Sequence, residues 1–559
     1  MVFKKAYKMK YILVVIISSL FNYVVNSQVN MQWAKQVGNA QSEAEWTTCV
    51  DAFGNVYVTG GFTGTVDFDP GIGTFNITAA STSDNFILKL DPSGNLVSVR
   101  TVTAISVRTM YIDPSGNIYT AGQFTNTTDF DPGPGTYTMS AAAGGNYLLK
   151  LDALGNFVWA RKIANAGISL PLAITSDALN NVYTTGYFIS APDFDPGPGS
   201  FLLLGNGGTD VFISKLDVSG NFVWAKQLGG TSNESGSSIN INSSGNIITS
   251  GSFAGIVDFD PGAGTYTLDA SNGGTFISQI DGSGNFVTAQ QIGGSGRSSC
   301  FDSSFNLYVT GIFNSIADFD PSPSTYTLNA SNGSFYVTKL DPFGNFIWAR
   351  QMGVSYPNGE PVSISADISG VYTAGYFQTS GDFDSGPGVL TFTSLGGYDS
   401  YISKLDPSGN FLWAEQIGGT TGEIIWGLAV DAPGNVYTSG TFDGTTDFDP
   451  GAGAYNLTSV GGTDVFIHKL TQGSSNINET GLQNEFIIKP NPVSDKLFFK
   501  NLNGADVKKY VLLNSQGKEV LTAQNTTEEL DVSSLPDGLY FLQVQTKEGV
   551  KTKKIVIEH

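Results

Sequence analysis

The side chains in this sequence with the clearest potential for chemistry are seven pairs of aspartates. Each pair belongs to an Asp-Phe-Asp string, and successive strings are 60 to 65 residues apart. In an extended segment alternate side chains share a face, so the two carboxylates project together while the phenylalanine points the other way. Like charges held close favour a counterion, and calcium, which takes about six to eight oxygen ligands, suits them. The pairs are Asp67 and Asp69, Asp129 and Asp131, Asp193 and Asp195, Asp258 and Asp260, Asp318 and Asp320, Asp382 and Asp384, and Asp447 and Asp449.

The same strings also have a structural interpretation. A calcium loop of the D-x-D-x-D-G kind needs a third acid, and that position holds a glycine such as Gly71 or Gly133. A hairpin pinned by its phenylalanine, with aspartate side chains capping the turn, explains the pattern without a metal. Calcium at the pairs is therefore a hypothesis beside this structural alternative.

A second, less regular position could bind a ligand. It lies five residues before the residue that ends the first strand of each repeat, and its occupants are Trp46, Arg108, Leu172, Ser237, Arg297, Val362 and Trp426. If the repeats close into a ring, Trp426, Trp46 and Arg108 become neighbours on the face that also carries the Asp-Phe-Asp loops. Flat aromatic side chains beside a cation and carboxylates suit sugar rings or peptide surfaces. Packing between repeats is the structural alternative.

Few other residues could support catalysis. The chain has two histidines, His468 and His559, too few for a Ser–His–Asp triad or an imidazole metal site, and we expect His468 to lie on a strand surface. Cys49 and Cys300 hold the same strand position in repeats one and five, so we expect two buried thiols that are not joined in a disulfide. The net charge of −21 argues against a nucleic acid partner.

Short β-strands must position these residues. With 68 Gly, 37 Phe and only 14% charged residues, the composition is typical of a β-rich globular protein. Each repeat contains a GNVYVTG-like strand, a DVFISKLD-like strand and a strand with a Trp-Ala pair, and the joins LDPSGN and VDAPGN are predicted hairpin turns. Four strands repeated seven times predict an all-β fold, a seven-bladed β-propeller over residues 28–472.

The chain ends predict that the propeller closes. Met31–Val37 matches only the fourth strand of a repeat, and Asp464–Leu470 matches a third strand with no fourth after it. Pairing of these two segments would complete the last blade, whereas an open solenoid, the competing fold, would leave both incomplete. Five tryptophans recur in the fourth strand and are predicted to be core residues: Trp33, Trp159, Trp224, Trp348 and Trp413.

The repeat resembles the secreted β-propeller repeat family called SBBP over nearly all of residues 31–470. After a polar linker at 473–485, residues 486–559 become Lys-rich and Gly-poor, and their alternating strands predict a small Ig-like β-sandwich. This tail resembles the type A sorting domain of the type IX secretion system, on the basis of Asn491-Pro492-Val493 and the stretch Leu535–Tyr540. The resemblance implies outer-membrane translocation by that machinery, followed by removal or anchoring of the tail.

Residues 1–27 are predicted to be a signal peptide. Four lysines precede the apolar run from Tyr11 to Val25, which is short for a membrane span of about 20 residues. Cleavage near Ser27 would leave a mature chain without a transmembrane segment, secreted or held at the cell surface. Its acidity lies in residues 28–472, which carry 14 basic and 38 acidic side chains, against 10 and 11 in 473–559.

Together these features predict an exported, non-catalytic propeller that binds a glycan or a protein, with Trp46, Arg108 and Trp426 as ligand-binding residues. Two alternatives stay open: a glycan-processing hydrolase or lyase that uses paired carboxylates, and a calcium-stabilised structural scaffold. A catalytic pair should be singular and lie in one cleft, whereas the Asp-Phe-Asp pairs recur seven times. The sequence therefore assigns no catalytic residue.

Overall fold

The computed structural model describes residues 29–103, 105–165, 169–353, 359–451 and 453–472, and in the tail 486–489, 493–501, 507–514, 519–524, 529–536, 538–546 and 549–558. The predicted signal peptide at 1–27 and linker at 473–485 lie outside these residues. Val29–Gln472 form one compact unit, and the described tail residues belong to a second. The described residues are all-β, and none forms a helix long and apolar enough to cross a bilayer.

The first unit consists of antiparallel groups of four strands, here called blades 1 to 7 in chain order. Short pairings extend the sheet of blade 3 into blade 4 and that of blade 6 into a small hairpin of blade 7. From the inner to the outer strand, blade 1 consists of β2 (Ala44–Val50), β3 (Val56–Phe62), β6 (Asp84–Leu90) and β7 (Leu96–Thr103); blade 2 of β8 (Ile105–Ile112), β9 (Ile118–Asp129), β10 (Thr138–Leu151) and β11 (Phe157–Asn165); and blade 3 of β12 (Ser169–Ser176), β13 (Val182–Phe188), β14 (Asp210–Leu216) and β15 (Phe222–Gly230). In the same order, blade 4 consists of β16 (Ser235–Ile241), β17 (Ile247–Asp258), β18 (Thr267–Ile280) and β19 (Phe286–Ile292), and blade 5 of β20 (Ser295–Phe301), β21 (Leu307–Asp318), β22 (Thr327–Leu340) and β23 (Phe346–Met352). Blade 6 consists of β24 (Gly359–Asp367), β25 (Gly370–Phe377), β28 (Asp399–Leu405) and β29 (Phe411–Gly419), and blade 7 of β30 (Glu423–Val430), β31 (Val436–Phe442), β34 (Asp464–Gln472) and β1 (Val29–Val37).

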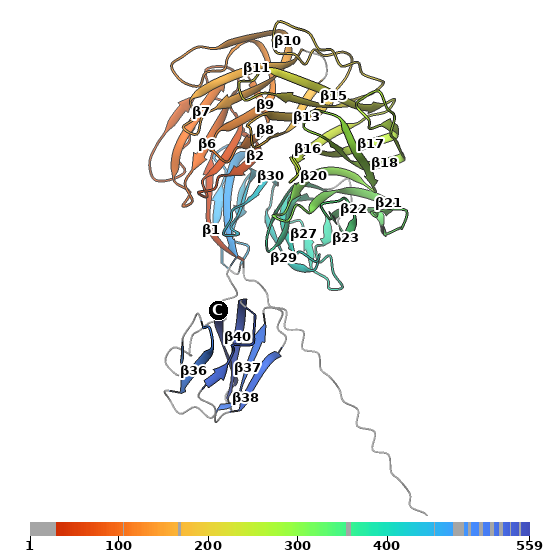
Figure 1. Ribbon diagram of the computed structural model, residues 1–559. Helices are drawn as coiled ribbons and strands as arrows, with labels where there is room; N and C mark the ends of the chain where they lie inside the picture. Colours follow the sequence, from red (N-terminus) through yellow and green to blue (C-terminus); the bar gives the residue numbers. More distant parts are fainter. Residues whose placement is uncertain are drawn as a thin grey trace, which may run out of the picture. The chain divides into compact units, whose positions relative to one another are not determined.

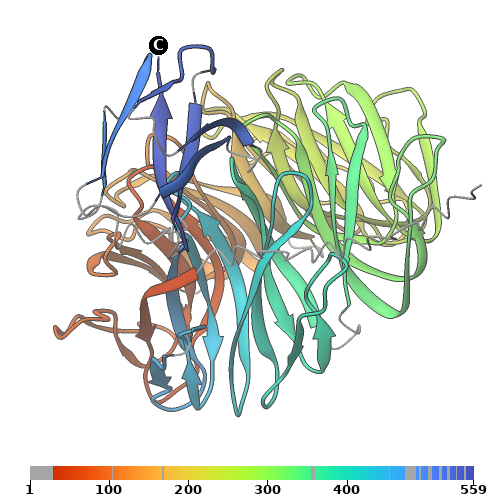
Figure 2. The same ribbon diagram turned by 90° about the horizontal axis from the view of Figure 1, so that it is seen from below.

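The first and last strands close the ring as the sequence predicts. β1 pairs antiparallel with β34, with Ala34 opposite His468 and Val37 opposite Val465. The inner strands β2, β8, β12, β16, β20, β24 and β30 contact one another in this order, and β30 contacts β2. Figure 1 shows them toward the centre, and Figure 2 shows the blades side by side as twisted sheets. The closed propeller is confirmed, and the open solenoid is excluded for this unit.

The Asp-Pro-Ser-Gly-Asn joins are hairpin turns held by their aspartates, as predicted. In the turn after β6, Asp91 Oδ1 accepts hydrogen bonds from the backbone N–H groups of Ser93 at 2.8 Å and Asn95 at 2.9 Å. Gly94 has a φ of 79°, the left-handed conformation that such a turn needs. Most of the short joins between first and second strands, and between third and fourth strands, use the same bonds, so these acids shape the turn face of the ring.

The Asp-Phe-Asp strings extend the hairpin between the second and third strands. In blades 2, 4 and 5 the two strands run on without a break and include the first aspartate. In blades 1, 6 and 7 the string begins in a separate small hairpin: β4 (Thr65–Asp67) with β5 (Asn76–Thr78), β26 (Ser380–Asp382) with β27 (Thr391–Thr393), and β32 (Thr445–Asp447) with β33 (Asn456–Thr458). The phenylalanine of every string is fully buried, as expected of an anchor.

Several of the five fourth-strand tryptophans join their blade to the next one. Trp348 of blade 5 packs against Gly409 in the outer turn of blade 6, and its Nε1–H donates to Pro407 O at 3.2 Å. Trp159 makes the equivalent bond to Val218 O at 3.1 Å. Trp159, Trp348 and Trp413 are buried, whereas Trp33 and Trp224 are half-buried. The prediction that these tryptophans form the core is confirmed for the three buried residues, and the bonds of Trp159 and Trp348 show that these two also seal blade interfaces.

The tail consists of two sheets over one core. The first contains β35 (Phe486–Lys489), β36 (Lys496–Asn501) and β39 (Glu529–Asp531); the second contains β38 (Glu519–Gln524), β37 (Val507–Asn514), β40 (Gly538–Thr546) and β41 (Gly549–Ile557). Leu497 from the first sheet and Leu512, Leu542 and Ile555 from the second belong to one buried cluster. The predicted small β-domain is present, while its assignment as Ig-like stays a prediction.

Candidate ligand-binding site

The seven positions singled out in the sequence are structurally equivalent, because each is the extra residue of a β-bulge in an inner strand. In blade 7, Ile425 lies opposite Gly440 and Gly427 opposite Ser439, so Trp426 has no partner of its own. The register shifts in the same way around Trp46, Arg108, Leu172, Ser237, Arg297, Val362 and Trp426. A bulge re-aims the side chain that it carries, so the described side chains at these positions, all but that of Trp46, are re-aimed at the same level of the ring.

The last glycine of the GNVYVTG-like strand makes this bulge fit. A Cβ on Gly440 would overlap the carbonyl oxygen of Ile424, two residues before Trp426. The equivalent glycine of every other blade faces the equivalent carbonyl, as Gly60 faces Ala44 O and Gly122 faces Ser106 O. The repeated glycine is therefore required by the close approach of the bulged strand, and it marks the bulge in the sequence.

The three residues predicted to bind a ligand follow one another around the ring, since β30, β2 and β8 are consecutive inner strands. Trp426 and Arg108 are half-buried. The side chain of Trp46 lies outside the described part of the structure, so only its place in β2 is established. The predicted order of Trp426, Trp46 and Arg108 is thus confirmed for their backbone positions.

The described ring contact of Trp426 leads to blade 6 and belongs to an aromatic cluster, defined here as Trp426, Tyr376 and Tyr398. The Trp426 ring lies 6.1 Å from Tyr376, and the Tyr376 ring lies 5.1 Å from Tyr398, edge to face in both cases. The Trp426 Nε1–H donates to Thr441 Oγ1 at 3.3 Å, which fixes the indole. All three rings are half-buried, so part of each aromatic surface is open to a ligand.

Two charged side chains adjoin the aromatic cluster. The Tyr376 hydroxyl donates to Glu360 Oε2 at 3.2 Å, and the other carboxylate oxygen of Glu360 forms an ion pair with Arg297 of blade 5. Burial, together with the Glu360 carboxylate, raises the pKa of Tyr376 to about 12. The phenol therefore stays protonated and acts as the donor of this hydrogen bond. About a third of each charged side chain is exposed, 32% for Arg297 and 29% for Glu360.

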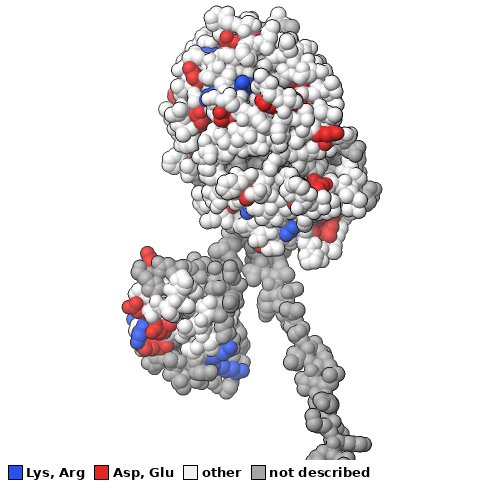
Figure 3. Space-filling view, turned by 45° about the vertical axis from the view of Figure 1, so that its right-hand side comes forward, with Lys and Arg blue, Asp and Glu red and all other residues white. Residues whose placement is uncertain are grey.

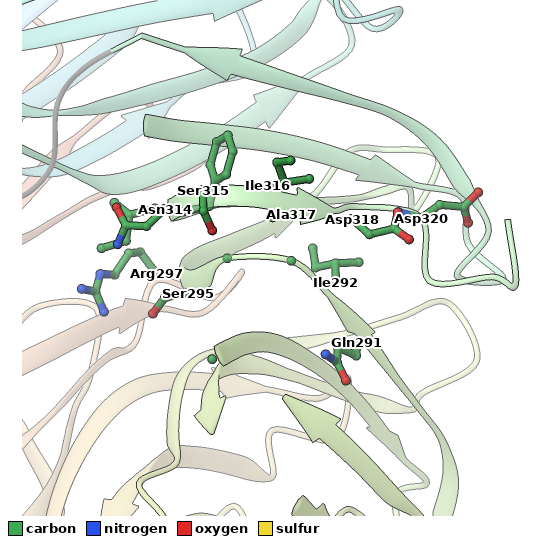
Figure 4. Close-up of a pocket in the computed structure, with 15 residues that line it drawn as sticks. Gln291, Ile292, Ser295, Arg297, Asn314, Ser315, Ile316, Ala317, Asp318 and Asp320 are labelled. Carbon is green, nitrogen blue, oxygen red and sulfur yellow. The ribbon is translucent and has the colours of Figure 1, made fainter. Parts of the chain in front are cut away.

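A cavity of about 660 Å³ lies between blades 4 and 5 next to Arg297. Figure 4 shows Arg297 at one end and one of the predicted pairs, Asp318 and Asp320, at the other. Gln291 from β19 and Asn314 from β21 contribute amide groups to its wall. The predicted association of a bulge residue with an Asp-Phe-Asp loop on one face is therefore present in this cavity.

The carboxylates of the Asp-Phe-Asp pairs are used within their own loops. Asp67 Oδ1 accepts from the backbone N–H groups of Asp69 at 3.1 Å and Phe75 at 2.7 Å, and Asp69 Oδ1 accepts from Gly71 N–H at 2.8 Å. The same three bonds recur in all seven copies. Among the described residues, no three Asp, Glu, His or Cys side chains form a group that could hold a metal ion. The geometry favours the capping interpretation, and calcium stays a prediction.

Two expectations about single residues need correction. His468 is fully buried in β34, not on a strand surface, and burial lowers the pKa of its imidazole to about 3. Cys49 and Cys300 are not in a disulfide, as expected, but both are half-buried, not buried. The cysteines lie on inner strands, which line the centre of the ring and are only partly covered there.

Carboxylates are spread over the visible surface of the propeller in Figure 3, where most side chains are uncharged. Blades, bulges and closing strand define the first unit as a β-propeller, the class that the sequence predicts. The second unit is similar to a known tail. A family model for a secretion system C-terminal sorting domain matches residues 488–558, which confirms the resemblance to the type IX sorting domain. The protein is an exported β-propeller, secreted or attached at the cell surface, with a tail that implies interaction with the secretion machinery.

Among curated proteins, an uncharacterized WD repeat-containing protein of Acanthamoeba polyphaga mimivirus is 24% identical over 491 residues, which is 76% of this chain and 33% of that protein. The chain thus spans about a third of the length of this curated relative.

Several solved structures are similar at low identity. BamB from Moraxella catarrhalis is 12% identical with a TM-score of 0.36, and the match covers 79% of this chain and 99% of that chain. The extracellular domain of the hybrid two component system BT3049 from B. thetaiotaomicron is 11% identical with a TM-score of 0.16, covering 94% and 100%. PorZ, a bacterial surface component of the type-IX secretion system of Porphyromonas gingivalis, is 8% identical with a TM-score of 0.16, covering 94% and 100%.

Proposed function

We propose that this exported propeller is a non-catalytic binding module that takes a glycan at the end of the ring where the bulges lie. The observation that carries the proposal is the aromatic cluster of Trp426, Tyr376 and Tyr398 beside the ion pair of Arg297 and Glu360. Half-buried rings give flat apolar surface for the faces of a sugar, and the charged groups offer hydrogen bonds to its hydroxyls.

The neighbouring cavity extends this surface toward blade 4. Its volume of about 660 Å³ is in the range typical of small-ligand sites. Arg297 lies at the junction, since it lines the cavity and pairs with Glu360 next to the aromatic cluster. An oligosaccharide that stacks on Trp426 would therefore reach Arg297 and, beyond it, the carboxylates of Asp318 and Asp320.

The acids support binding better than catalysis. A glycosidase needs one carboxyl group as acid and a second as base or nucleophile across a scissile bond. The Asp-Phe-Asp carboxylates instead accept backbone hydrogen bonds in all seven loops, Asp318 and Asp320 included. Glu360 is held by an ion pair with Arg297 and a hydrogen bond from Tyr376. A hydrolase or lyase remains the rival function, and a calcium-stabilised scaffold the third.

A glycan array probed with the whole chain and two variants tests the proposal. Trp426→Ala removes stacking surface and Arg297→Gln removes the cation, and each should weaken binding of the same glycans at least about tenfold, which corresponds to about 1.4 kcal/mol. Arg350→Gln is the matched control, because Arg350 lies in the same blade as Arg297 but donates to the carbonyls of Gly409 and Ser408 in an outer turn. Its binding should equal that of the unaltered chain.

The same samples distinguish the rival functions. Binding that all three variants keep, or no binding to any glycan by a folded chain, would contradict the proposed site. Release of new reducing ends or unsaturated sugars from the bound glycans would show a hydrolase or lyase and contradict the non-catalytic assignment. A folded chain that binds no glycan, and that calcium stabilises, would instead support the scaffold.

A further inference from the structure

Two buried carboxylates converge on a glycine pair where blade 3 meets blade 4. The Asp210 carboxylate lies so close to Gly229 that a Cβ on this glycine would overlap it. Glu234 Oε2 accepts from the N–H of the next residue, Gly230, at 3.0 Å. Asp210 is 0% and Glu234 1% exposed. Both acids are thus held against one short segment, away from water.

The same arrangement recurs where blade 7 meets blade 1, at the closure of the ring. The Asp464 carboxylate lies over Gly38, and Glu43 Oε2 accepts from Asn39 N–H at 3.2 Å. Asp464 is 0% and Glu43 3% exposed. These residues belong to a different pair of blades, so the arrangement is a device of the repeat and not of one loop.

Each of the two pairs has two oxygens that lack a hydrogen-bond partner among the described residues. They are Oδ1 of the aspartate and Oε1 of the glutamate: Asp210 with Glu234, and Asp464 with Glu43. The remaining oxygen of each carboxylate is the one that accepts from backbone N–H groups. A buried charged oxygen without a partner is costly, so these four need a compensating group.

The third junction of this kind shows how such an oxygen can be satisfied. Where blade 6 meets blade 7, Glu423 occupies the position of Glu234, and its Oε1 accepts from the Thr446 hydroxyl at 2.7 Å. The residues equivalent to Thr446 are Val257 in blade 4 and Val66 in blade 1, both buried. The two unpartnered glutamate oxygens therefore occur where a valine replaces the hydroxyl donor.

The acids of a junction also occur together. Glu43, Glu234 and Glu423 each stand three residues before a bulge residue, and each follows a blade whose third strand begins with an aspartate. The other four junctions have no glutamate and carry Ile105, Ser169, Gly294 or Gly359 there. At the junction that carries Ile105, the third strand of the preceding blade also begins with an aspartate, Asp84. Both of its carboxylate oxygens accept hydrogen bonds, from Ala80 N–H at 2.7 Å and from Ser81 Oγ at 2.6 Å. A glutamate is never present without its aspartate.

We propose that the Asp210–Glu234 and Asp464–Glu43 pairs each hold one proton, so that the blade junctions lose stability when this proton leaves. The proton removes one of the two buried negative charges of the pair, and with it part of the cost of burying unpartnered carboxylate oxygens. The neighbouring charge that raises the pKa of Glu234 is that of Asp210, and the one that raises the pKa of Glu43 is that of Asp464. The charge of Asp443 in turn raises the pKa of Asp464. All of these groups are acids. Among the described residues, no three Asp, Glu, His or Cys side chains at either pair form a group that could hold a metal ion.

The direction of the pH dependence follows from burial. Desolvation, with a smaller contribution from the partner aspartate, raises the pKa of Glu43 and of Glu234 from 4.5 to about 7. The folded chain then binds protons more tightly than the unfolded chain. The stabilisation is complete below pH 4.5 and is lost as the pH rises toward about 7. The proton thus favours a closed ring in mildly acidic surroundings.

Thermal unfolding of the whole chain, followed by tryptophan fluorescence, tests the proposal, because all seven tryptophans lie in the propeller. The midpoint should fall between about pH 5 and about pH 8. Glu43→Gln with Glu234→Gln mimics the protonated form and should remove the part of this fall that the two pairs cause. Glu423 and Glu415, whose pKa burial also raises to about 7, should cause the remainder. Asp84→Asn is the matched control and should leave the fall unchanged. An equal fall in the double variant and the unaltered chain would overturn the proposal.

Two further measurements keep the test decisive. Val257→Thr supplies the hydroxyl that blade 7 has, so it should raise the midpoint at about pH 8 more than at about pH 5, and an equal or opposite effect counts against the proposal. Calcium added at about pH 8 should leave the midpoint of the unaltered chain unchanged. If calcium raises the unfolding midpoint of the unaltered chain at about pH 8, but not that of the double glutamine variant, the pairs bind a metal ion. The proposal that each pair holds a proton is then wrong.

Discussion

Gly60 lies directly against the carbonyl group of Ala44, and a Cβ at position 60 would overlap that oxygen. The next residue, Gly61, has room for a side chain, since the nearest atom to its Cβ would be Ser83 Oγ at 3.7 Å. The two adjacent glycines therefore have different roles. Gly60 allows the bulge that carries Trp46, whereas Gly61 lies within β3 without such a close approach.

Substitution of these two glycines should have unequal effects. Gly60→Ala must push the inner strand away or flatten the bulge, and we expect it to lower the free energy of unfolding by about 1 to 3 kcal/mol. Gly61→Ala should change it by less than about 0.5 kcal/mol. Urea unfolding followed by tryptophan fluorescence measures both. Equal losses would show that the bulge does not depend on this close approach.

The glycine also shows what the sequence could and could not predict. The repeat length, the turn aspartates and the unmatched chain ends predict the closed propeller, because they reflect local chemistry and strand pairing. The bulge was not predicted, although the recurring Gly60 and Gly440 carried its signal. A glycine in a strand has several explanations, and only the coordinates identify a carbonyl as the reason for this one.

Substitution of Trp413 in blade 6 should cost less stability than the same substitution of Trp348 in blade 5. Trp348→Phe loses the hydrogen bond to Pro407 O and should cost about 0.5 to 1.5 kcal/mol beyond the loss of ring area. Trp413 has no partner for Nε1 among the described residues, because blade 7 is completed by β1 and has no turn there. Trp413→Phe should therefore cost less. Unfolding midpoints of the two variants give the comparison, and equal costs would argue against the missing turn as the cause.

Part of the candidate site could not be found from repeats. Trp426 stood out because its position could be aligned in all seven copies. Glu360, Tyr376 and Tyr398 come from positions that vary between blades, and their association depends on how blade 6 faces Arg297. The prediction of a surface position for His468 was wrong because the serines that it replaces, Ser214 and Ser403, are themselves buried.

The Asp-Phe-Asp loops should depend on their first aspartate as a hydrogen-bond acceptor and not as a charge. Asp129 Oδ1 accepts two backbone N–H groups, at 3.1 Å from Asp131 and 2.8 Å from Tyr137. Asp129→Ala should lower the free energy of unfolding by about 1 to 2 kcal/mol. Asp129→Asn keeps an oxygen acceptor and should cost clearly less. If calcium binds there, Asp129→Asn would instead reduce the shift in unfolding midpoint that a chelator causes.

The hydrogen bond from the Thr446 hydroxyl should contribute more to the free energy of unfolding as the pH rises. It donates to Glu423 Oε1, and burial raises the pKa of Glu423 to about 7 despite this bond. Thr446→Val would recreate the surroundings of Glu234, raise that pKa further and cost about 1 to 2 kcal/mol at about pH 8, with a smaller loss at about pH 5. Thr445→Val is the control, because the neighbouring hydroxyl is exposed and its bond among the described residues is to the Thr458 hydroxyl. Unfolding at both pH values measures the difference, and a loss that does not depend on pH would mean that Glu423 keeps its charge throughout.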